Sequence, residues 1–291
     1  FINDISSTFF KDNYMKLYNK EFFGAQYSQD IANGVNLKGK IEYSKRKPLF
    51  NTSNYSFVKN DKLYTSNNPL APNDYINPGF ETHHLTTFNL NAKLNFGNKF
   101  ITRPDGKYNI KNNKYPTLFL NYEKGFAANE RKYEFDKVEA KISYNILLEN
   151  KGELALNLNG GKFFNADNIS FIDYKHFNGN QTHVGVTDKY LDTFLLLPYY
   201  SNSTNTSFFQ LHSEYNDNGF IMNKIPLLSA LKTQLVMGYH ALGVPNKKPY
   251  NEFNIGLDRL GFGKFKILRI DYVRSYENGV KTDGFVFGLK F

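Results

Sequence analysis

Apolar residues recur at every second position in many short stretches of this chain, a pattern that predicts β-strands. Between Val35 and Tyr43 the odd positions are Val, Leu, Gly, Ile and Tyr, while the even positions are Asn, Lys, Lys and Glu. The C-terminal stretch repeats the pattern on an aromatic face made of Phe285, Phe287, Leu289 and Phe291. Each strand is therefore expected to present one apolar face and one polar face.

Eleven stretches show this alternation, at residues 20–30, 35–44, 85–96, 116–126, 138–146, 154–159, 209–216, 235–241, 253–257, 268–272 and 285–291. Asn33 and Gly34 form a hairpin signal between the first two. The longest connections, at about residues 45–84 and 164–205, are rich in polar residues. A short helix is predicted at residues 224–231.

We interpret the pattern as an all-β fold, a transmembrane antiparallel β-barrel of about 12 strands with long extracellular loops. Such barrels have an even strand number when both termini lie on the periplasmic side. The twelfth strand is expected within residues 1–18 or upstream of them. If residue 291 lies on the periplasmic side, the two longest loops both fall outside, as expected for such barrels, whereas the periplasmic connections at 97–115 and 217–231 are longer than expected. Residues 1–291 are expected to be one outer-membrane β-barrel domain, the C-terminal part of a longer precursor.

A large soluble β-sandwich or barrel is the alternative, because periodicity cannot tell the inside of a barrel from its outside. The many Phe and Tyr residues would overfill the interior of a small barrel. Polar faces turned inward would instead line a lumen with charged side chains that pair across it. We predict a lumen charge network of Glu214, Asp258, Arg269, Asp271 and Lys290. We also predict that Phe285, Phe287, Leu289 and Phe291 belong to the strand that closes the barrel.

The amino-acid composition excludes several other classes of protein and site. The 291 residues contain no Cys, which excludes disulfides and thiolate metal sites, and no apolar run is long enough for a transmembrane helix. The net charge is +9, yet the Lys and Arg residues are scattered, so we expect no nucleic-acid binding and attribute the charge to anionic lipid head groups. No signal peptide opens the sequence, and we expect the chain to be a mature or truncated piece.

Several stretches carry a family resemblance. They are 13–18 (NYMKLY), 31–34 (IANG), 42–49 (EYSKRKPL), 112–116 (NNKYP), 161–165 (GKFFN), 173–180 (DYKHFNGN), 225–228 (IPLL), 256–260 (GLDRL) and 268–273 (LRIDYV). Together they resemble the C-terminal barrel of a Bacteroidota outer-membrane family of unassigned function. The resemblance implies that full-length members carry an N-terminal carboxypeptidase regulatory-like domain, which has no peptidase activity. It supplies no catalytic motif.

Two groups of residues were weighed for chemistry. His176 and His183 share the second long loop with Asp167, Asp173 and Asp188, which is a weak signal for a metal site. His212, Glu214 and His240, with Ser207 or Ser213, form a weak signal for a lipase-like site, because alternation points Ser213 and His212 to opposite faces. We therefore expect no catalytic residues, no metal and no cofactor.

The expected function follows from the long loops and a filled lumen. We predict an anchoring, scaffold or accessory subunit of a larger outer-membrane complex for uptake, protein insertion or secretion. Its partners would be outer-membrane lipid and other outer-membrane proteins. Extracellular contacts are assigned to Asp173, Tyr174, His176, Phe177, Asn178 and His183. A narrow channel for small solutes or an export substrate is the alternative, and an outer-membrane hydrolase is a third.

Overall fold

The fold is built from one large antiparallel sheet. The computed structural model describes residues 2–58, 61–110, 114–185, 189–226, 228–263 and 265–289. Asp188, Lys290 and Phe291, which were named above as candidates, lie outside this described part. The all-β class predicted from the alternating pattern is confirmed.

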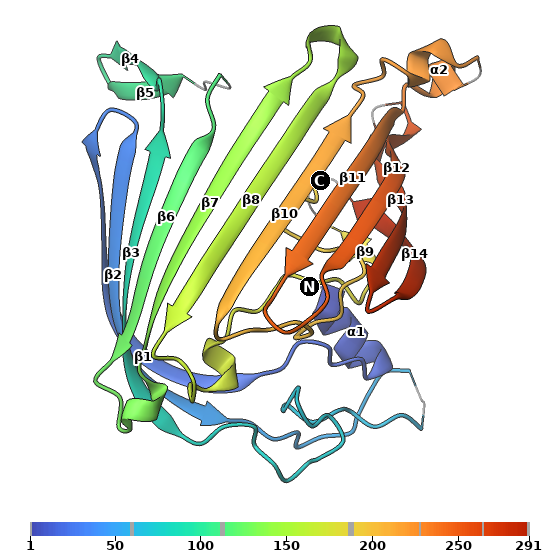
Figure 1. Cartoon of the computed structure of the whole chain (residues 1–291). Coiled ribbons are helices and arrows are strands. Elements are labelled where there is room, and N and C mark those ends of the chain that lie inside the picture. Colours follow the sequence, from blue (N-terminus) through green and yellow to red (C-terminus); the bar gives the residue numbers. More distant parts are fainter. Residues whose placement is uncertain are drawn as a thin grey trace.

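Twelve strands form this sheet (Figure 1). In spatial order they are β1 (Tyr18–Ala32), β2 (Val35–Pro48), β3 (His83–Asn95), β6 (Thr117–Phe126), β7 (Phe135–Leu147), β8 (Glu153–Phe164), β10 (Ser207–Asn216), β11 (Gln234–Gly243), β12 (Tyr250–Phe262), β13 (Phe265–Glu277), β14 (Val280–Leu289) and β9 (Val184–Gly185). All eleven predicted stretches overlap these strands, five of them with both ends within two residues, and the end of the last stretch lies outside the described residues. Successive strands from β1 to β14 pair antiparallel, whereas the two-residue β9 pairs parallel with β14.

The remaining elements correct two expectations. Residues 2–10, one of the two places expected for a twelfth strand, form a helix, α1 (Ile2–Phe10), whereas a strand upstream of residue 1 stays a prediction. The twelfth strand of the observed sheet is the two-residue β9 within the second long loop. The connection after β3 holds an unforeseen separate hairpin of β4 (Lys99–Arg103) and β5 (Gly106–Ile110).

Short helical turns complete the fold, at η1 (Arg131–Tyr133), η2 (Glu149–Lys151), η3 (Phe171–Asp173), η4 (Met222–Lys224) and α2 (Leu228–Leu231). The last two lie at the two ends of the stretch 224–231 that was predicted to be helical, and residues 225 and 226 between them are not helical. None of the helices in the described residues is both long and apolar enough to cross a membrane.

The two longest connections start and finish at the same end of the sheet, as expected, although connections of 21 and 17 residues after β3 and β10 lie at the other end. Residues 49–82 lie with α1 at one end, which Figure 1 shows at the bottom, and residues 165–206 leave β8 and return to β10 there. We call this the loop end. The turns after β1, β7 and β12 lie at the other end, which we call the turn end.

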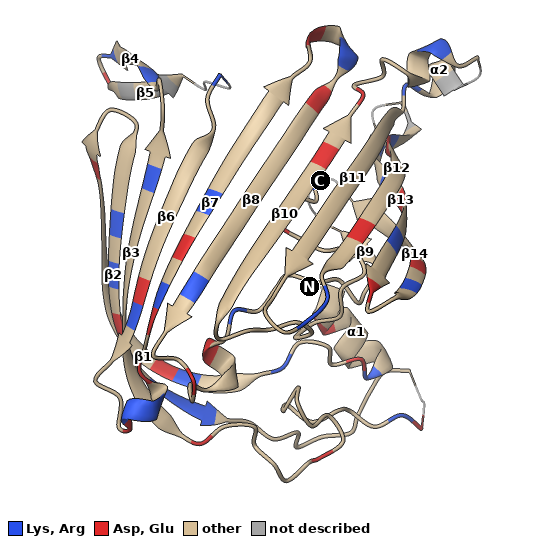
Figure 2. Cartoon of the chain, in the orientation of Figure 1, with Lys and Arg blue, Asp and Glu red and all other residues tan. Residues whose placement is uncertain are grey.

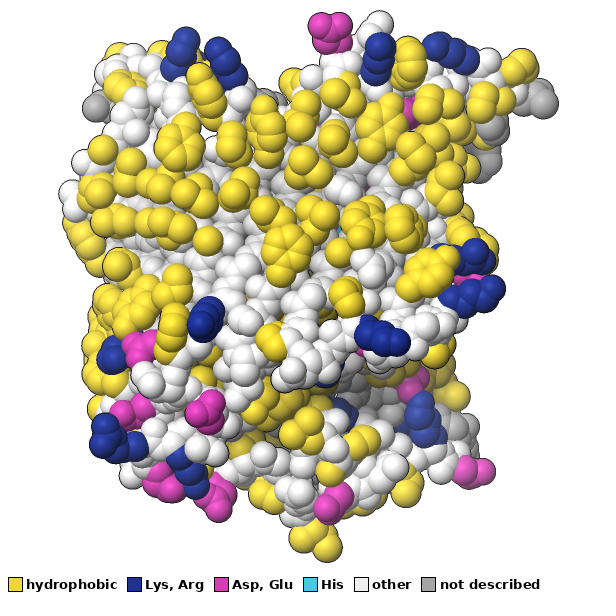
Figure 3. All heavy atoms as spheres, in the orientation of Figure 1, with side chains coloured by type: hydrophobic (Ala, Val, Ile, Leu, Met, Phe, Trp, Pro, Cys, Tyr) yellow, Lys and Arg dark blue, Asp and Glu magenta, His cyan; other side chains and the backbone are white. Residues whose placement is uncertain are grey.

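The two faces of the sheet differ in polarity. On β2, Ile41 and Tyr43 are 47% and 49% exposed, whereas Glu42 and Ser44 between them are 4% and 0% exposed. Charged residues lie in the middle of several strands in Figure 2, yet hydrophobic side chains dominate the middle of the surface in Figure 3. The alternating pattern therefore turns apolar side chains outward and polar ones to the inner face.

Near the loop end the inner face becomes apolar, which the sequence pattern did not predict. Three buried clusters combine strand residues with residues of the second long loop. In one of them, Phe177, Phe194 and Leu197 of the loop pack with Phe208, Leu242 and Tyr250 of the strands. The core of the molecule therefore lies between the sheet and its own loop.

Candidate functional site: the inner face and the loop that covers it

A buried charge cluster occupies the inner face of β10 and β13. Arg269 is 1% exposed, and its Nη2 lies 2.9 Å from Glu214 Oε2. Its Nε and Nη2 also donate to the two carboxylate oxygens of Asp271, at 2.6 and 2.9 Å. Asn254 donates a further hydrogen bond to Asp271. Each buried charge thus has an opposite charge within hydrogen-bond distance, and the two carboxylates share the one guanidinium.

The structure joins Glu214, Arg269 and Asp271 of the predicted network by direct contacts. Asp258 is also buried, at 1% exposed, and its Oδ1 accepts from the backbone N–H of Arg259 at the turn end of β12. Lys290 lies outside the described residues. The alternating pattern was sufficient to place these side chains on one face, since residues two apart in a strand share a face.

Tyr190 of the second long loop covers the cluster. Its ring centroid lies 4.1 Å from the Arg269 guanidinium carbon, and its backbone N–H donates to Glu214. A guanidinium over an aromatic face gains electrostatic attraction that increases when water is excluded. The loop therefore seals the charge cluster from solvent.

Glu252 fixes the loop a few residues further on. This carboxylate is 0% exposed and accepts hydrogen bonds from the backbone N–H groups of Leu195 and Leu196 and from the Tyr250 hydroxyl. Backbone N–H groups that are buried without a partner are strongly destabilising, so Glu252 makes burial of this loop segment possible.

Further polar contacts follow the loop across the sheet. Ion pairs join Arg46 to Asp173, Glu139 to Lys175, Glu153 to Lys189 and Lys141 to Asp192. The Asn157 amide donates to Leu191 O and to Asp192. Strands β2, β7 and β8 thus contribute to holding the loop as well as β10 and β12.

The loop also reaches the edge of the sheet. Val184 and Gly185 pair with Phe287 and Gly288 of β14, and the Phe287 N–H donates to His183 O. Phe285 and Phe287 face outward, at 56% and 52% exposed, while Val286 is buried. Within the described residues β14 pairs with β13 and β9 and not with β1, and Leu289 is its last residue.

The residues expected to make extracellular contacts mostly serve the loop itself. Burial raises the pKa of the Asp173 carboxyl, which Arg46 opposes, and burial lowers the pKa of His176. His176 Nδ1 shares a hydrogen bond with the Ser203 hydroxyl, Tyr174 packs on Phe171, and Phe177 is buried. Asn178 and His183 are exposed, yet the Asn178 amide donates to Asp192 O and the His183 ring bonds Phe285 O.

The two histidines weighed for hydrolysis bond each other. Their Nδ1 atoms lie 2.8 Å apart between His212 and His240, while the Ser213 hydroxyl donates to Tyr239 O. Within the described residues no group of three or more His, Asp or Glu side chains is placed to hold a metal ion.

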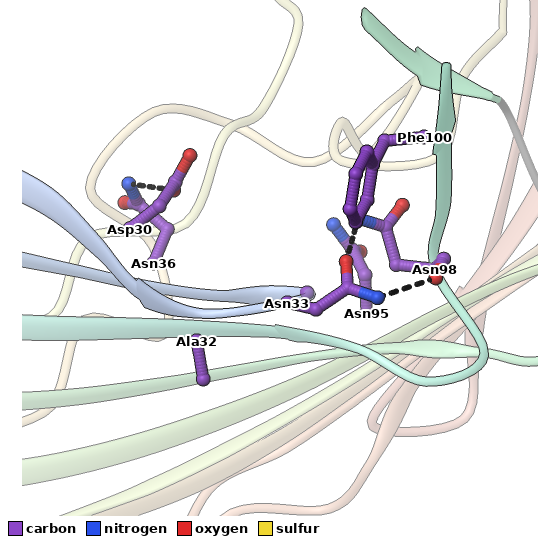
Figure 4. Close-up of a pocket in the computed structure, with 8 residues that line it drawn as sticks. Asp30, Ala32, Asn33, Asn36, Asn95, Asn98 and Phe100 are labelled. Atoms are coloured by element: carbon purple, nitrogen blue, oxygen red, sulfur yellow. Dashed lines mark hydrogen bonds between the residues drawn. The ribbon is translucent and has the colours of Figure 1, made fainter. Parts of the chain in front are cut away.

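Cavities lie at both ends of the sheet. At the loop end a hollow of about 550 Å³ opens among Phe80, Tyr133, Phe171 and Tyr174. At the turn end a cavity of about 400 Å³ is lined by Asp30 and several asparagines (Figure 4). The Asn33 amide donates to the backbone oxygen of Asn98, and the Asn98 amide donates to the side-chain oxygen of Asn33.

The second cavity marks where the first hairpin packs on the end of β3. Gly34 has φ +78°, and a Cβ there would lie 2.3 Å from Asn95 O, so only glycine fits this turn. Because the amides in this cavity largely bond one another, it serves hairpin packing.

The sequence reasoning missed the role of the second long loop. Its signal was the run of four consecutive apolar residues from Phe194 to Leu197. Three of these four residues are fully buried. Such a run is incompatible with a solvent-exposed loop and predicts that the loop packs inward.

These features define the class of protein. It is an all-β protein with one long sheet, and a loop of the same chain packs on part of the polar inner face of that sheet. The chain belongs to the family described as "Family of unknown function (DUF5686) C-terminal domain", whose model matches residues 1–257. A comparison with curated proteins finds no match.

Proposed function

We propose that this chain is an outer-membrane β-barrel that acts as an anchoring, scaffold or accessory subunit of a larger outer-membrane complex. The observation that carries the proposal is the inversion of polarity, with large apolar side chains exposed on the outer face and charged ones buried inside. In water an exposed apolar face of this extent is unfavourable, whereas in lipid it is stabilising. The Bacteroidota origin and an N-terminal carboxypeptidase regulatory-like domain in the full-length protein belong to the same proposal.

The packing of the second long loop on the inner face supports the subunit role. The second long loop is held by ion pairs, by Glu252 and by apolar clusters, which leaves the inner face committed to packing rather than to a passage. At the loop end, the aromatic hollow beside Tyr174 offers a contact surface to a second protein. Nutrient uptake, protein insertion and secretion machineries are the candidate assemblies.

The test is to tag the full-length protein in its own cells, fractionate the membranes and extract them with a mild detergent. We expect the protein in the outer-membrane fraction and in a native complex larger than the monomer. Recovery in the soluble fraction contradicts the membrane assignment, and migration as a monomer contradicts the subunit role.

A narrow transport path is the second candidate. Buried ionic side chains such as Glu214 and Arg269 on an inner face favour it, because such groups mark routes for polar substrates in membrane proteins. Planar-bilayer recordings distinguish the two candidates. Conductance of the parent protein, increased by Glu252→Ala through release of the loop, supports transport, and a silent bilayer for both proteins supports the subunit role.

A further inference from the structure

A further cavity lies at the loop end, where residues 11–16 and the two long loops meet. Its volume is about 280 Å³. The charged residues that line it are Lys11, Lys16, Lys62 and Asp12. Lys62 forms an ion pair with Asp12. The described lining therefore carries more positive than negative charge, which favours an anionic ligand.

Lys16 has no carboxylate partner in the described part of the chain. Its Nζ donates to the Thr65 hydroxyl, which is neutral. Burial lowers the pKa of Lys16 to about 8, and no neighbouring charge contributes to the shift. An ammonium group that is partly withdrawn from water is stabilised when an anion lies beside it. An anion in this cavity therefore gains an ion pair with Lys16 that displaces no existing one.

The segment that carries Lys16 is held in place on both sides. The Lys16 N–H donates to the Tyr200 hydroxyl of the second long loop. The Asn13 amide donates to Thr65 O, and the Thr65 N–H and hydroxyl both donate to Asn13 Oδ1. A cavity whose walls are already fixed binds a ligand at a lower entropic cost.

Two other residues of the lining have donors without an acceptor among the described residues. The Gln181 side-chain oxygen accepts from the Tyr199 N–H, whereas no described group accepts from the Gln181 amide nitrogen. The Tyr14 hydroxyl also lacks a hydrogen-bond partner there. An ammonium, an amide and a hydroxyl that line one cavity match a phosphoryl group, which combines negative charge with several acceptor oxygens.

Exposed apolar side chains on both sides of Lys16 indicate a lipid as the source of the phosphate. Met15 and Leu17 are 54% and 65% exposed. In a lipid the phosphate is joined to acyl chains, so apolar side chains next to a basic pocket favour a lipid over a small soluble phosphate.

We propose that this cavity binds the phosphate of a membrane lipid, with Lys16 against the phosphate and Met15 and Leu17 against the acyl chains. The Gln181 amide and the Tyr14 hydroxyl donate to the remaining phosphate oxygens. The lipid source rests on the proposed membrane function, whereas the phosphate site rests only on the cavity.

Calorimetric titration of the purified full-length protein in a nonionic detergent tests the site with matched probes. Dihexanoyl phosphatidic acid carries an open phosphate and acyl chains. Dihexanoyl phosphatidylcholine carries the same chains but a phosphate capped by choline, and glycerol phosphate carries the phosphate without chains.

The variants separate the cavity from the general surface charge. Lys16→Met removes the cation, and Lys16→Arg keeps a positive charge at the same place. Lys247→Met is the matched control, because Lys247 is exposed between β11 and β12 and does not line the cavity. Equal midpoints in denaturant titration check that all variants are folded.

The parent protein is expected to bind phosphatidic acid most tightly, glycerol phosphate less tightly and phosphatidylcholine most weakly. Lys16→Met should weaken the binding of phosphatidic acid about tenfold or more, because a charge-assisted contact is lost. Lys16→Arg should lose less, and Lys247→Met should stay within about twofold of the parent. Equal losses in Lys16→Met and Lys247→Met, or equal binding of the two lipids, overturn the proposal.

No binding of any probe also overturns the proposal, and it is the result expected if another part of the full-length chain fills the cavity. Glycerol phosphate bound as tightly as phosphatidic acid overturns the lipid source. Fractionation of the cell membranes tests the membrane function separately. A protein that fractionates with the outer membrane but binds no probe loses only this site, so the two failures are distinguished.

Discussion

The first strand of the sheet and its late strands β12 and β13 follow the same alternating pattern, but their polar side chains differ in burial. On β12 and β13, which the second long loop covers, inward residues such as Glu252 and Asp271 are 0% exposed. On β1, which the loop does not cover, all residues but one are exposed, whichever face they point to. Alternation determines the face on which a side chain lies, whereas the loop determines whether a charge on that face becomes part of the core.

The difference has an energetic consequence. Arg269 lies between two carboxylates that are as buried as itself, so removal of one partner leaves an uncompensated charge. Glu42 on β2 is also buried, but its partners Lys20 and Lys40 have side chains that are 31% and 41% exposed. If one lysine is lost, the other lysine or water can still bind the Glu42 carboxylate. An ion pair between two buried side chains is therefore expected to contribute more to stability than a pair with a partly exposed partner.

Arg269→Met is expected to have the largest effect. It leaves Glu214 and Asp271 buried without their cation and removes the guanidinium from the Tyr190 ring, at a cost of about 3–5 kcal/mol in the free energy of unfolding. Denaturant titration of the protein refolded in lipid vesicles measures the change. Lys40→Met is the matched control on the uncovered side and is expected to cost less than about 1 kcal/mol. Equal costs in both variants contradict the comparison.

The same comparison explains what the sequence could predict. The strands and the buried positions of Glu214, Arg269 and Asp271 follow from period-two alternation, which is a local property. The apolar run from Phe194 to Leu197 indicates that the loop packs inward, but the place where it docks depends on contacts between residues far apart in the chain, such as Glu252 with Leu195, which no local pattern encodes. The helix at Ile2–Phe10 was missed because its residues carry no period-two stripe and were assigned by strand parity alone.

Glu252→Gln is expected to loosen the loop. The amide keeps one acceptor oxygen but loses the charge and the second acceptor, so at least one of the Leu195 and Leu196 N–H groups loses its partner. Charge-assisted hydrogen bonds contribute about 1.5–3 kcal/mol each, which sets the expected loss. Hydrogen exchange measured by mass spectrometry should increase at residues 190–197.

Glu153→Gln serves as the control for this change. It removes an ion pair with Lys189, in which both side chains are partly exposed, and is expected to alter exchange much less. If Glu252→Gln leaves exchange at residues 190–197 unchanged, Glu252 does not hold the loop.

A smaller effect is expected from pH at the loop end. His176 is packed between Phe171 and Tyr200, and burial lowers the pKa of its ring below the ordinary 6.5. As pH falls through 6.5, the unfolded chain binds a proton that the folded chain does not, so stability decreases until the folded-state pKa is passed. Denaturant titrations across this range should show a shallower pH dependence for His176→Gln than for the parent. Identical profiles contradict this role of His176.

The smallest effect is expected from Tyr190→Phe. The Tyr190 hydroxyl is buried without a hydrogen-bond partner in the described part of the chain, and it packs against Gly185 of β9 and Gly288 of β14. Removal of an unsatisfied hydroxyl is nearly neutral or stabilising, so the free energy of unfolding should stay within about 1 kcal/mol of the parent. Tyr250→Phe is the matched control, because the Tyr250 hydroxyl donates to Glu252 at 2.7 Å, and its loss should cost about 1.5–3 kcal/mol. A Tyr190→Phe cost equal to that of Tyr250→Phe means that the hydroxyl is bonded, and the contact between β9 and β14 then depends on a polar bond as well as on ring packing over Arg269.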